Sequence, residues 1–230
     1  MSSNYRSEYD AFQRYITGKS MPIRFILKSL FSMIPDFFEF LFRDIPGPIG
    51  MLLRRSFYRL RLGALGKNSL IDVGVYFKGH KNIFIGDWCW IDSQVKLEAL
   101  IGEIRIGKRV HVASQVIIGA REPVIIDDYA AIAAGAKIYS NSEVPKDGLH
   151  MSGPMIPEAM KAYSSQRIFI GKDALVGCNS VLLPGASLKE GAILGAQSML
   201  KETIPAWEIW GGVPAKLIGL RSHKIEMPNP

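Results

Sequence analysis

Residues 170–200 read IGKDALVGCNSVLLPGASLKEGAILGAQSML and carry the most regular pattern in the chain. An apolar residue returns at every sixth position, and a small Ala or Ser follows most of these residues four positions later. A period of six matches neither an α-helix, at about 3.6 residues per turn, nor a single strand, at about 2. It fits a triangular coil in which each side is one short strand and a turn. The predicted inward-pointing residues are Ile170, Val176, Leu182, Leu188, Leu194 and Leu200.

Earlier stretches keep the same step, which lengthens by two or three residues where one stretch passes to the next. A corner of the coil can be widened by such insertions without disturbing the inward positions. We therefore expect an all-β solenoid, a parallel β-helix over residues 63–207, with about six coils. Its further inward residues are Leu65, Ile71 and Phe77 in a weaker set, then Ile85, Ile91 and Leu97, Ile106, Val112 and Ile118, and Ile126, Ile132 and Ile138.

Residues 144–167 break the period and contain three prolines, which predicts a loop extruded from the solenoid. Within it, residues 157–163 are compatible with a short helix. After the last repeat, residues 208–230 form a tail in which we expect a short basic helix at 215–225.

The N-terminal region, residues 1–62, has helical patterns instead. Residues 21–34 show the i, i+3, i+4, i+7 spacing of an amphipathic helix, 36–43 are rich in Phe, and 50–60 carry another apolar stripe. We interpret this region as a helical cap over the open end of the solenoid, which would otherwise expose its core. A second interpretation, compatible with the first, is a patch that docks on a membrane beside a lipid-linked substrate.

The bulk composition describes a folded protein with a basic surface. Of the 230 residues, 48% are hydrophobic, and the net charge of +7 favours anionic partners. No basic–aromatic groove motif supports a nucleic-acid partner. The two distant cysteines, the absence of a signal-like apolar segment in the first twenty residues and the charges that interrupt residues 21–60 favour a cytoplasmic protein, with peripheral contact at the inner membrane as an option.

Three C-terminal segments, LLPGASL, LGAQSML and GGVPAKLIGLR, resemble the ending of the hexapeptide-repeat acyltransferases. That family includes galactoside, maltose, xenobiotic and surface-polysaccharide acetyltransferases, and the resemblance covers residues 65–221. It implies a left-handed parallel β-helix, a homotrimer with active sites between neighbours, and acetyl-CoA as the donor, with no metal. By position in the motifs, the residues that contact acetyl-CoA are Cys178, Ala196, Lys201, Lys216 and Arg221.

Transfer to a hydroxyl or an amine needs a general base, for which histidine is suited near neutral pH. In many relatives the catalytic histidine follows a strand that corresponds to AKIYSNSE here, and this alignment places Glu143 at its position. Three alternatives follow. His111 is the base and Glu143 orients it from a shared intersubunit groove, or His150 swings in from the loop, or Glu143 acts itself. His80 and His223 are expected at the surface.

The function that this resemblance implies is transfer of an acetyl group from acetyl-CoA to a sugar hydroxyl in lipopolysaccharide, O-antigen or capsule biosynthesis. An N-acetyltransferase acting on a nucleotide-linked amino sugar is the first alternative, although no GxGxxG marks a sugar-nucleotide domain. A non-catalytic β-helix scaffold is the second, because Glu143 replaces the family's histidine. A zinc enzyme is disfavoured, since no two histidines lie within 30 residues of each other.

Overall fold

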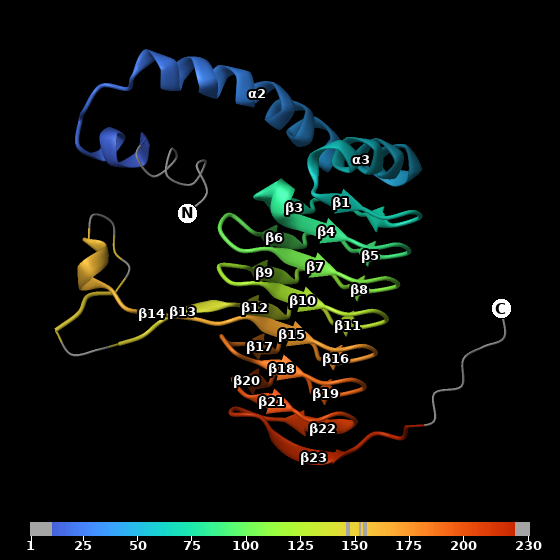
Figure 1. The fold of residues 1–230 in the computed structure, drawn as a ribbon. Helices are drawn as coiled ribbons and strands as arrows, with labels where there is room; N and C mark the ends of the chain where they lie inside the picture. The colour runs from blue at the N-terminus through green and yellow to red at the C-terminus, as the bar shows by residue number, and fades with distance from the viewer. Residues whose placement is uncertain (1–10, 146–147, 152, 154–155, 224–230) are drawn as a thin grey trace.

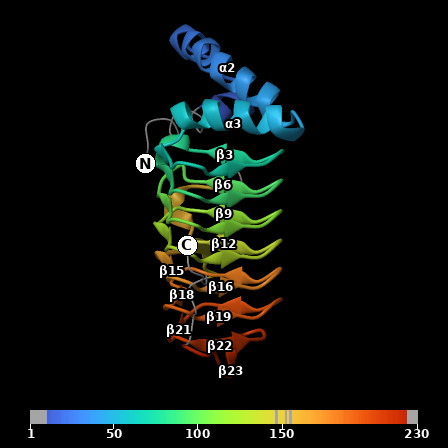
Figure 2. The ribbon, with the colours of Figure 1, turned by 90° about the vertical axis from the view of Figure 1, so that its right-hand side faces the viewer.

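The computed structural model describes residues 11–145, 148–151, 153 and 156–223. The chain forms a tall prism of stacked coils, with helices at its N-terminal end and a hairpin that leaves one side (Figure 1). The coils pile directly on one another, so that strands one coil apart pair in parallel (Figure 2). The predicted all-β solenoid is confirmed.

Three parallel sheets, here named A, B and C, form the sides of the prism. Sheet A contains β1 (Ala64–Leu65), β4 (Ile83–Ile85), β7 (Ile104–Ile106), β10 (Val124–Ile126), β15 (Ile168–Ile170), β18 (Ser187–Leu188) and β21 (Thr203–Ile204). Sheet B contains β2 (Leu70–Ile71), β5 (Trp90–Ile91), β8 (His111–Val112), β11 (Ala131–Ile132), β16 (Leu175–Val176), β19 (Ile193–Leu194), β22 (Glu208–Gly211) and the antiparallel β23 (Lys216–Leu220). Sheet C contains β3 (Tyr76–Lys78), β6 (Lys96–Glu98), β9 (Ile117–Gly119), β12 (Lys137–Tyr139), β17 (Val181–Leu182) and β20 (Met199–Leu200).

The core is the column of inward side chains. Every residue of the predicted six-step series from Ile71 to Leu200 is at most 4% exposed, while Leu65 in the first coil is half-buried. The small residues four positions later, such as Ala174 and Ser180, are buried at the corners. Each fully buried aliphatic side chain stabilises the fold by roughly 1.5–3 kcal/mol, so the repeat is the main source of stability.

Two of the three corners place one residue per coil in the left-handed region of the backbone. The corner between sheets A and B, named the A–B corner, uses bulky residues in several coils, with φ of +60° at Trp88, +55° at Arg109 and +62° at Tyr129. Bulky side chains rarely adopt this conformation, which indicates that the stacked coils impose it. At the corner between sheets B and C, named the B–C corner, the same place is held by Gly74, Gln94, Gln115, Gly135, Asn179, Gln197 and Gly212.

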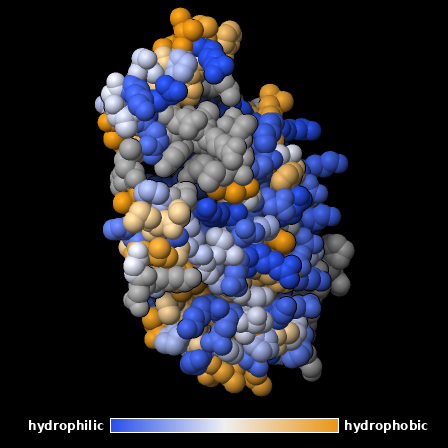
Figure 3. Space-filling view, turned by 60° about the vertical axis from the view of Figure 1, so that its left-hand side comes forward, coloured by the Kyte–Doolittle hydropathy of each residue, from blue (hydrophilic) through white to orange (hydrophobic). Residues whose placement is uncertain are grey.

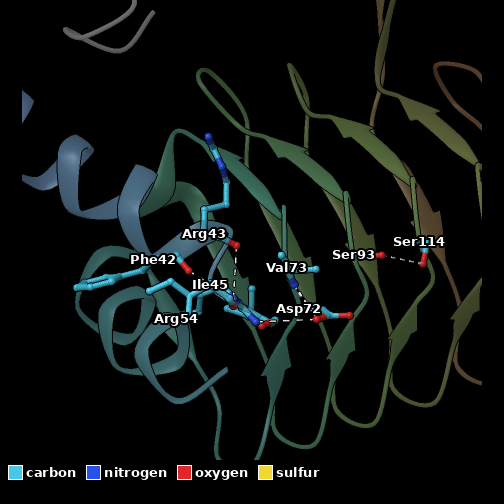
Figure 4. Close-up of polar contacts among 9 residues, drawn as sticks. Phe42, Arg43, Ile45, Arg54, Asp72, Val73, Ser93 and Ser114 are labelled. Atoms are coloured by element: carbon cyan, nitrogen blue, oxygen red, sulfur yellow. Dashed lines mark hydrogen bonds and ion pairs between the residues drawn. The ribbon is translucent and has the colours of Figure 1, made fainter. Parts of the chain in front are cut away.

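Helix α3 (Gly47–Arg61) covers the first coil, and one buried arginine attaches it there. Arg54 is fully buried and donates hydrogen bonds to the carbonyl oxygens of Ile45, at 2.6 Å, and Ile71, at 3.0 Å. Its guanidinium also lies 3.9 Å from the Asp72 carboxylate at the B–C corner (Figure 4). Burial lowers the pKa of Arg54, and the charge of Asp72 opposes that shift. Arg54 therefore links the cap to the first coil.

A second polar cluster attaches helix α2 (Ile23–Arg43). The buried carboxylate of Glu39 lies 2.9 Å from Nε2 of His80 and accepts a hydrogen bond from the hydroxyl of Tyr58 at 3.4 Å. Burial, and secondarily the charge of Glu39, raises the pKa of Tyr58, which keeps its hydroxyl protonated as a donor. His80 is therefore a half-buried contact in η1 (His80–Asn82) rather than the expected surface residue.

The C-terminal segment forms a strand where the sequence predicts a helix. The short basic helix predicted at 215–225 is wrong over the described residues, where β23 pairs antiparallel with β22 instead. An unpaired last strand would expose its backbone hydrogen-bonding groups, and β23 satisfies them on that edge. Residues 224–230 of the predicted tail and residues 1–10 of the predicted cap lie outside the described part.

The predicted loop 144–167 begins and ends as a two-stranded hairpin. Strand β13 (Asn141–Glu143) pairs antiparallel with β14 (Tyr163–Ser165), and the hairpin leaves the prism between sheets C and A (Figure 1). Within residues 157–163, where the sequence allows a short helix, the structure has a single 3-10 turn, η2 (Glu158–Met160). Residues 146–147, 152 and 154–155 of this loop lie outside the described part.

Arg54 provides a test of how strongly the cap is attached. In Arg54→Met the carbonyl oxygens of Ile45 and Ile71 lose a buried donor, and we expect the free energy of unfolding to fall by about 3 kcal/mol. Arg59→Ala, an exposed arginine on the same helix, serves as the control and should change it by less than about 0.5 kcal/mol. Urea denaturation followed by circular dichroism measures both, and equal midpoints for the two variants would contradict the role of Arg54.

Candidate active site

His111 stands on the outer surface of sheet B beside a carboxylate. It begins β8, and because Val112 points inward, the His111 side chain points outward and is half exposed. Its Nε2 lies 3.1 Å from Oδ2 of Asp92, which follows β5 one coil earlier at the B–C corner. Trp90 occupies the position of His111 in that earlier coil, and the two ring centroids lie 5.6 Å apart. The three residues form one cluster across two coils.

The carboxylate next to His111 in the single chain is Asp92, not Glu143. Glu143 lies on β13, in register with Tyr163 across the hairpin, and this hairpin leaves the prism between sheets C and A. His150 lies in the same extruded segment and forms a bridge with Lys161. The structure therefore brings neither residue to His111 within one chain, and their meeting in a groove between subunits stays a prediction.

Asp92 was absent from the residues that the sequence singled out. The spacing in the sequence could have pointed to Asp92. It precedes His111 by nineteen residues, close to one coil of eighteen, so the two residues lie in neighbouring coils. Strand pairing of Trp90 with His111 brings Asp92 to the corner beside the imidazole. The insertions between repeats make the alignment of neighbouring coils uncertain from sequence, because a shift of one residue changes which side chain lies at the corner.

The B–C corner changes character along the prism. In the early coils it carries polar side chains, and the hydroxyls of Ser93 and Ser114 lie 3.4 Å apart (Figure 4). In the later coils the same two corner positions hold small residues, and the second of the two is exposed at Ala134, Cys178 and Ala196. These positions hold Ala133 and Ala134, then Gly177 and Cys178, then Gly195 and Ala196.

Two of the predicted acetyl-CoA contacts stack at this corner. Cys178 and Ala196 occupy equivalent positions one coil apart, and the Gln197 N–H donates to the Cys178 carbonyl oxygen at 2.8 Å. A Cβ on Gly177 would lie 2.6 Å from the Gly195 carbonyl carbon, so glycine is required there for the coils to stack. Ser180 Oγ donates to the Gly195 carbonyl oxygen at 2.8 Å and fixes the corner from inside.

The predicted cationic contacts lie at two different places. Lys216 is exposed and pairs with Glu202 at 3.4 Å, next to Lys201 in sequence, so these two lysines share one region of the last coils. Arg221 instead pairs with Asp173 at 2.8 Å at the A–B corner. The structure therefore separates Arg221 from the other predicted contacts.

The described residues contain no group of three His, Cys, Asp or Glu side chains arranged to hold a metal ion. The chemistry available at the site is that of an imidazole buttressed by a carboxylate. Such a pair can remove a proton from a hydroxyl or an amine. The bare corner next to it can accept a long, thin substrate along the prism.

A parallel β-helix with a six-residue repeat and this corner defines a class, the hexapeptide-repeat acyltransferases. No model of a known protein family matches the chain. The chain is 38% identical to the dTDP-4-amino-4,6-dideoxy-D-glucose acyltransferase of Escherichia coli, over 70% of this chain and 84% of that protein. The chain belongs to the hexapeptide-repeat acyltransferase family, and its fold is the left-handed parallel β-helix, as predicted.

Other relatives cover similar shares of the chain. WbbJ of Escherichia coli K12, named for O-acetyl transfer in lipopolysaccharide biosynthesis, is 29% identical over 77% of this chain and 88% of its own. A point mutant of AntD, an N-acyltransferase from Bacillus cereus in complex with dTDP and coenzyme A, superposes with a TM-score of 0.67 at 27% identity, covering 74% of this chain and 90% of that one. The hexapeptide-repeat acetyltransferase VCA0836 of Vibrio cholerae, at 18% identity and a TM-score of 0.55 over 83% of this chain and 90% of its own, shares the fold.

The two cysteines offer a chemical probe of the corner. Cys178 is exposed, whereas Cys89 is buried, donates its thiol to the Gly107 carbonyl oxygen at 3.0 Å and has a pKa raised mainly by burial. Because the thiolate is the reactive form, we expect a thiol reagent such as DTNB to label only Cys178 in the native protein and both cysteines in denaturant. Acetyl-CoA should protect Cys178 if the pantetheine arm lies at the B–C corner. Rapid labelling of Cys89, with Cys178→Ser as the control, would contradict this assignment.

Proposed function

We propose that the protein transfers an acetyl group from acetyl-CoA to a sugar hydroxyl in surface-polysaccharide biosynthesis, with His111 as the general base. The observation that carries the proposal is the His111–Asp92 pair beside the small-residue B–C corner. A scaffold without activity has no need of an exposed imidazole paired with a carboxylate. In this proposal His111, held by Asp92, takes the role of the family's histidine, whose position Glu143 occupies.

In this proposal each side chain has one role. Asp92 accepts the Nε2–H of His111, so the lone pair of the neutral imidazole lies on Nδ1. Nδ1 removes the hydroxyl proton as the sugar oxygen attacks the thioester carbonyl. The tetrahedral intermediate collapses with cleavage of the C–S bond, and the proton passes from the imidazolium to the departing thiolate of CoA. The negative charge of Asp92 stabilises the imidazolium in between.

The donor fits the later coils of the B–C corner. Cys178 and Ala196 leave backbone accessible to the pantetheine arm, and Lys201 and Lys216 are exposed cations for the phosphates. AntD in complex with coenzyme A and in complex with 3-hydroxybutyryl-CoA supports an acyl-CoA donor. For Arg221 to contact a phosphate, it would have to leave Asp173.

The second half of the site comes from another copy of the chain, as the proposed homotrimer requires. Beyond His111 the outward column of sheet B is apolar and partly buried, which suits contact with a neighbour. Its members are Ala131, Leu175, Ile193 and Ile209. In this assembly the hairpin with Glu143 and His150 approaches a neighbour's groove. The free thiols of Cys89 and Cys178 support a reducing compartment, the cytoplasm.

A nucleotide-linked amino sugar is the second candidate acceptor, favoured by the 38% identical relative and by AntD. The hydroxyl is our first choice because it needs a base more than an amine does. A sugar hydroxyl is barely acidic, and a carboxylate-buttressed imidazole is suited to remove its proton as it attacks. WbbJ supports the same acceptor class.

Variants of the three candidate bases separate the alternatives. We expect His111→Ala to lower kcat by about 100-fold or more, since general-base catalysis contributes about 10²–10⁴. Asp92→Asn should lower kcat less, while acetyl-CoA still raises the melting temperature of both variants. His150→Ala and Glu143→Gln should retain most turnover. Normal turnover in His111→Ala, together with loss of turnover in His150→Ala or Glu143→Gln, would show that the general base lies in the hairpin.

The type of bond in the product identifies the acceptor, because a hydroxyl gives an ester and an amine gives an amide. With acetyl-CoA and a panel of sugars, we expect a product about 42 mass units heavier, the mass of an added acetyl group, which mild alkali removes as an ester requires. An alkali-stable product from dTDP-4-amino-4,6-dideoxyglucose would establish the amide and the second candidate. Mass spectrometry before and after alkali measures both, with His111→Ala as the blank.

A further inference from the structure

Helix α2 turns its apolar side away from the protein. Its polar side docks, through Glu39 on His80 and through Asp36, whose carboxylate lies 2.8 Å from the Arg61 guanidinium. The usual amphipathic helix of a water-soluble protein does the reverse and buries its apolar side. Eleven apolar residues of α2 are exposed, namely Ile23, Ile26, Leu27, Leu30, Phe31, Met33, Ile34, Phe37, Phe38, Phe40 and Leu41.

This apolar surface continues beyond α2. Exposed Ile49, Leu52 and Leu60 extend it over α3, and exposed Phe12 and Tyr15 lie in the preceding helical turns. Figure 3 shows hydrophobic residues at the surface of the upper end, where Figure 1 places α2. Monomeric soluble proteins rarely gather so many large exposed apolar side chains in one region, which points to a partner for this one.

The charge of the same segment identifies that partner. Residues 11–62 contain nine Lys or Arg and three Asp or Glu, a net charge of +6, against +7 for the whole chain. A second copy of this segment would bring like charges together in a contact between copies. An anionic bilayer offers an apolar phase for the Phe and Leu side chains and negative headgroups for the cations, such as the exposed Arg24 and Arg59.

We propose that α2 and α3 form an interfacial surface that docks the N-terminal end of the prism on an anionic lipid bilayer. Helix α2 lies in the plane of the interface and does not cross it. Among the described residues, no helix is long and apolar enough to span a membrane.

This orientation has a consequence for the active site. Strand β8 is the third strand of sheet B, so His111 lies about 10 Å along the prism from the first coil, at a strand spacing of about 4.8 Å. Helix α2 extends past the prism on the side from which the hairpin leaves (Figure 1). Helices α2 and α3, each about 10 Å in diameter, lie between the first coil and the bilayer, so an acceptor sugar carried on a lipid would have to reach past them to meet His111 and Asp92. The docking itself does not rest on the proposed reaction.

Sedimentation of the full chain with vesicles tests the docking. We expect binding to vesicles of about 70% phosphatidylcholine and 30% phosphatidylglycerol, and binding at least about tenfold weaker to pure phosphatidylcholine or at high salt. In the double variant Phe31→Glu and Phe37→Glu, binding to the anionic vesicles should fall by more than about tenfold. The matched control, Ile218→Glu and Leu220→Glu on β23, adds the same charge at exposed apolar residues of the opposite end and should bind like the wild type.

The outcomes are distinct. Equal loss in the α2 variant and the β23 control would mean that net charge alone attracts the protein, and the docking surface would be rejected. If the wild type ignores vesicles and the α2 variant changes the mass measured by light scattering, the surface is a contact between copies. A melting temperature for the α2 variant equal to that of the wild type shows that lost binding is not unfolding.

Discussion

The stacking of each coil on the one before it is the constraint from which the rest of this structure follows. Parallel pairing carries every position into the same place in the next coil, so that residues about eighteen apart become neighbours. An inward column of aliphatic side chains then stabilises the prism, and corner columns form chemical surfaces along its edges. His111 meets Asp92 for this reason alone, since no local element holds them together.

The same constraint explains how far the sequence predicts the structure. The inward residues follow from the period, because each of them must be apolar whatever the length of the corners. Asp92 does not follow, because a partner one coil away depends on the insertions between coils. The segment from Lys216 to Leu220 was misassigned as a helix because its pairing with β22 comes from the exposed edge of the last coil. Pairing of that kind overrides local propensity.

Periodicity also leaves open which side of an amphipathic helix is buried. The spacing of Ile23, Leu27 and Leu30 predicts a helix with one apolar side, and α2 is that helix. The side that docks is decided by Glu39, which is buried against His80 and Tyr58. A buried carboxylate is costly unless it is paired, so these contacts fix the orientation of the helix and expose its apolar side.

The B–C corner runs from the cap to the candidate active site. Arg54 of α3 reaches Asp72 in the first coil, and Asp92 holds the same corner position in the second coil, where it orients His111. In the later coils the side chains at this corner are small, around Cys178 and Ala196. A thin acyl donor suits the later coils, and an acceptor delivered near the cap suits the earlier ones. The two substrates would then approach His111 from opposite directions along one edge, and both could occupy the site at once, as the proposed direct transfer without an acyl-enzyme requires.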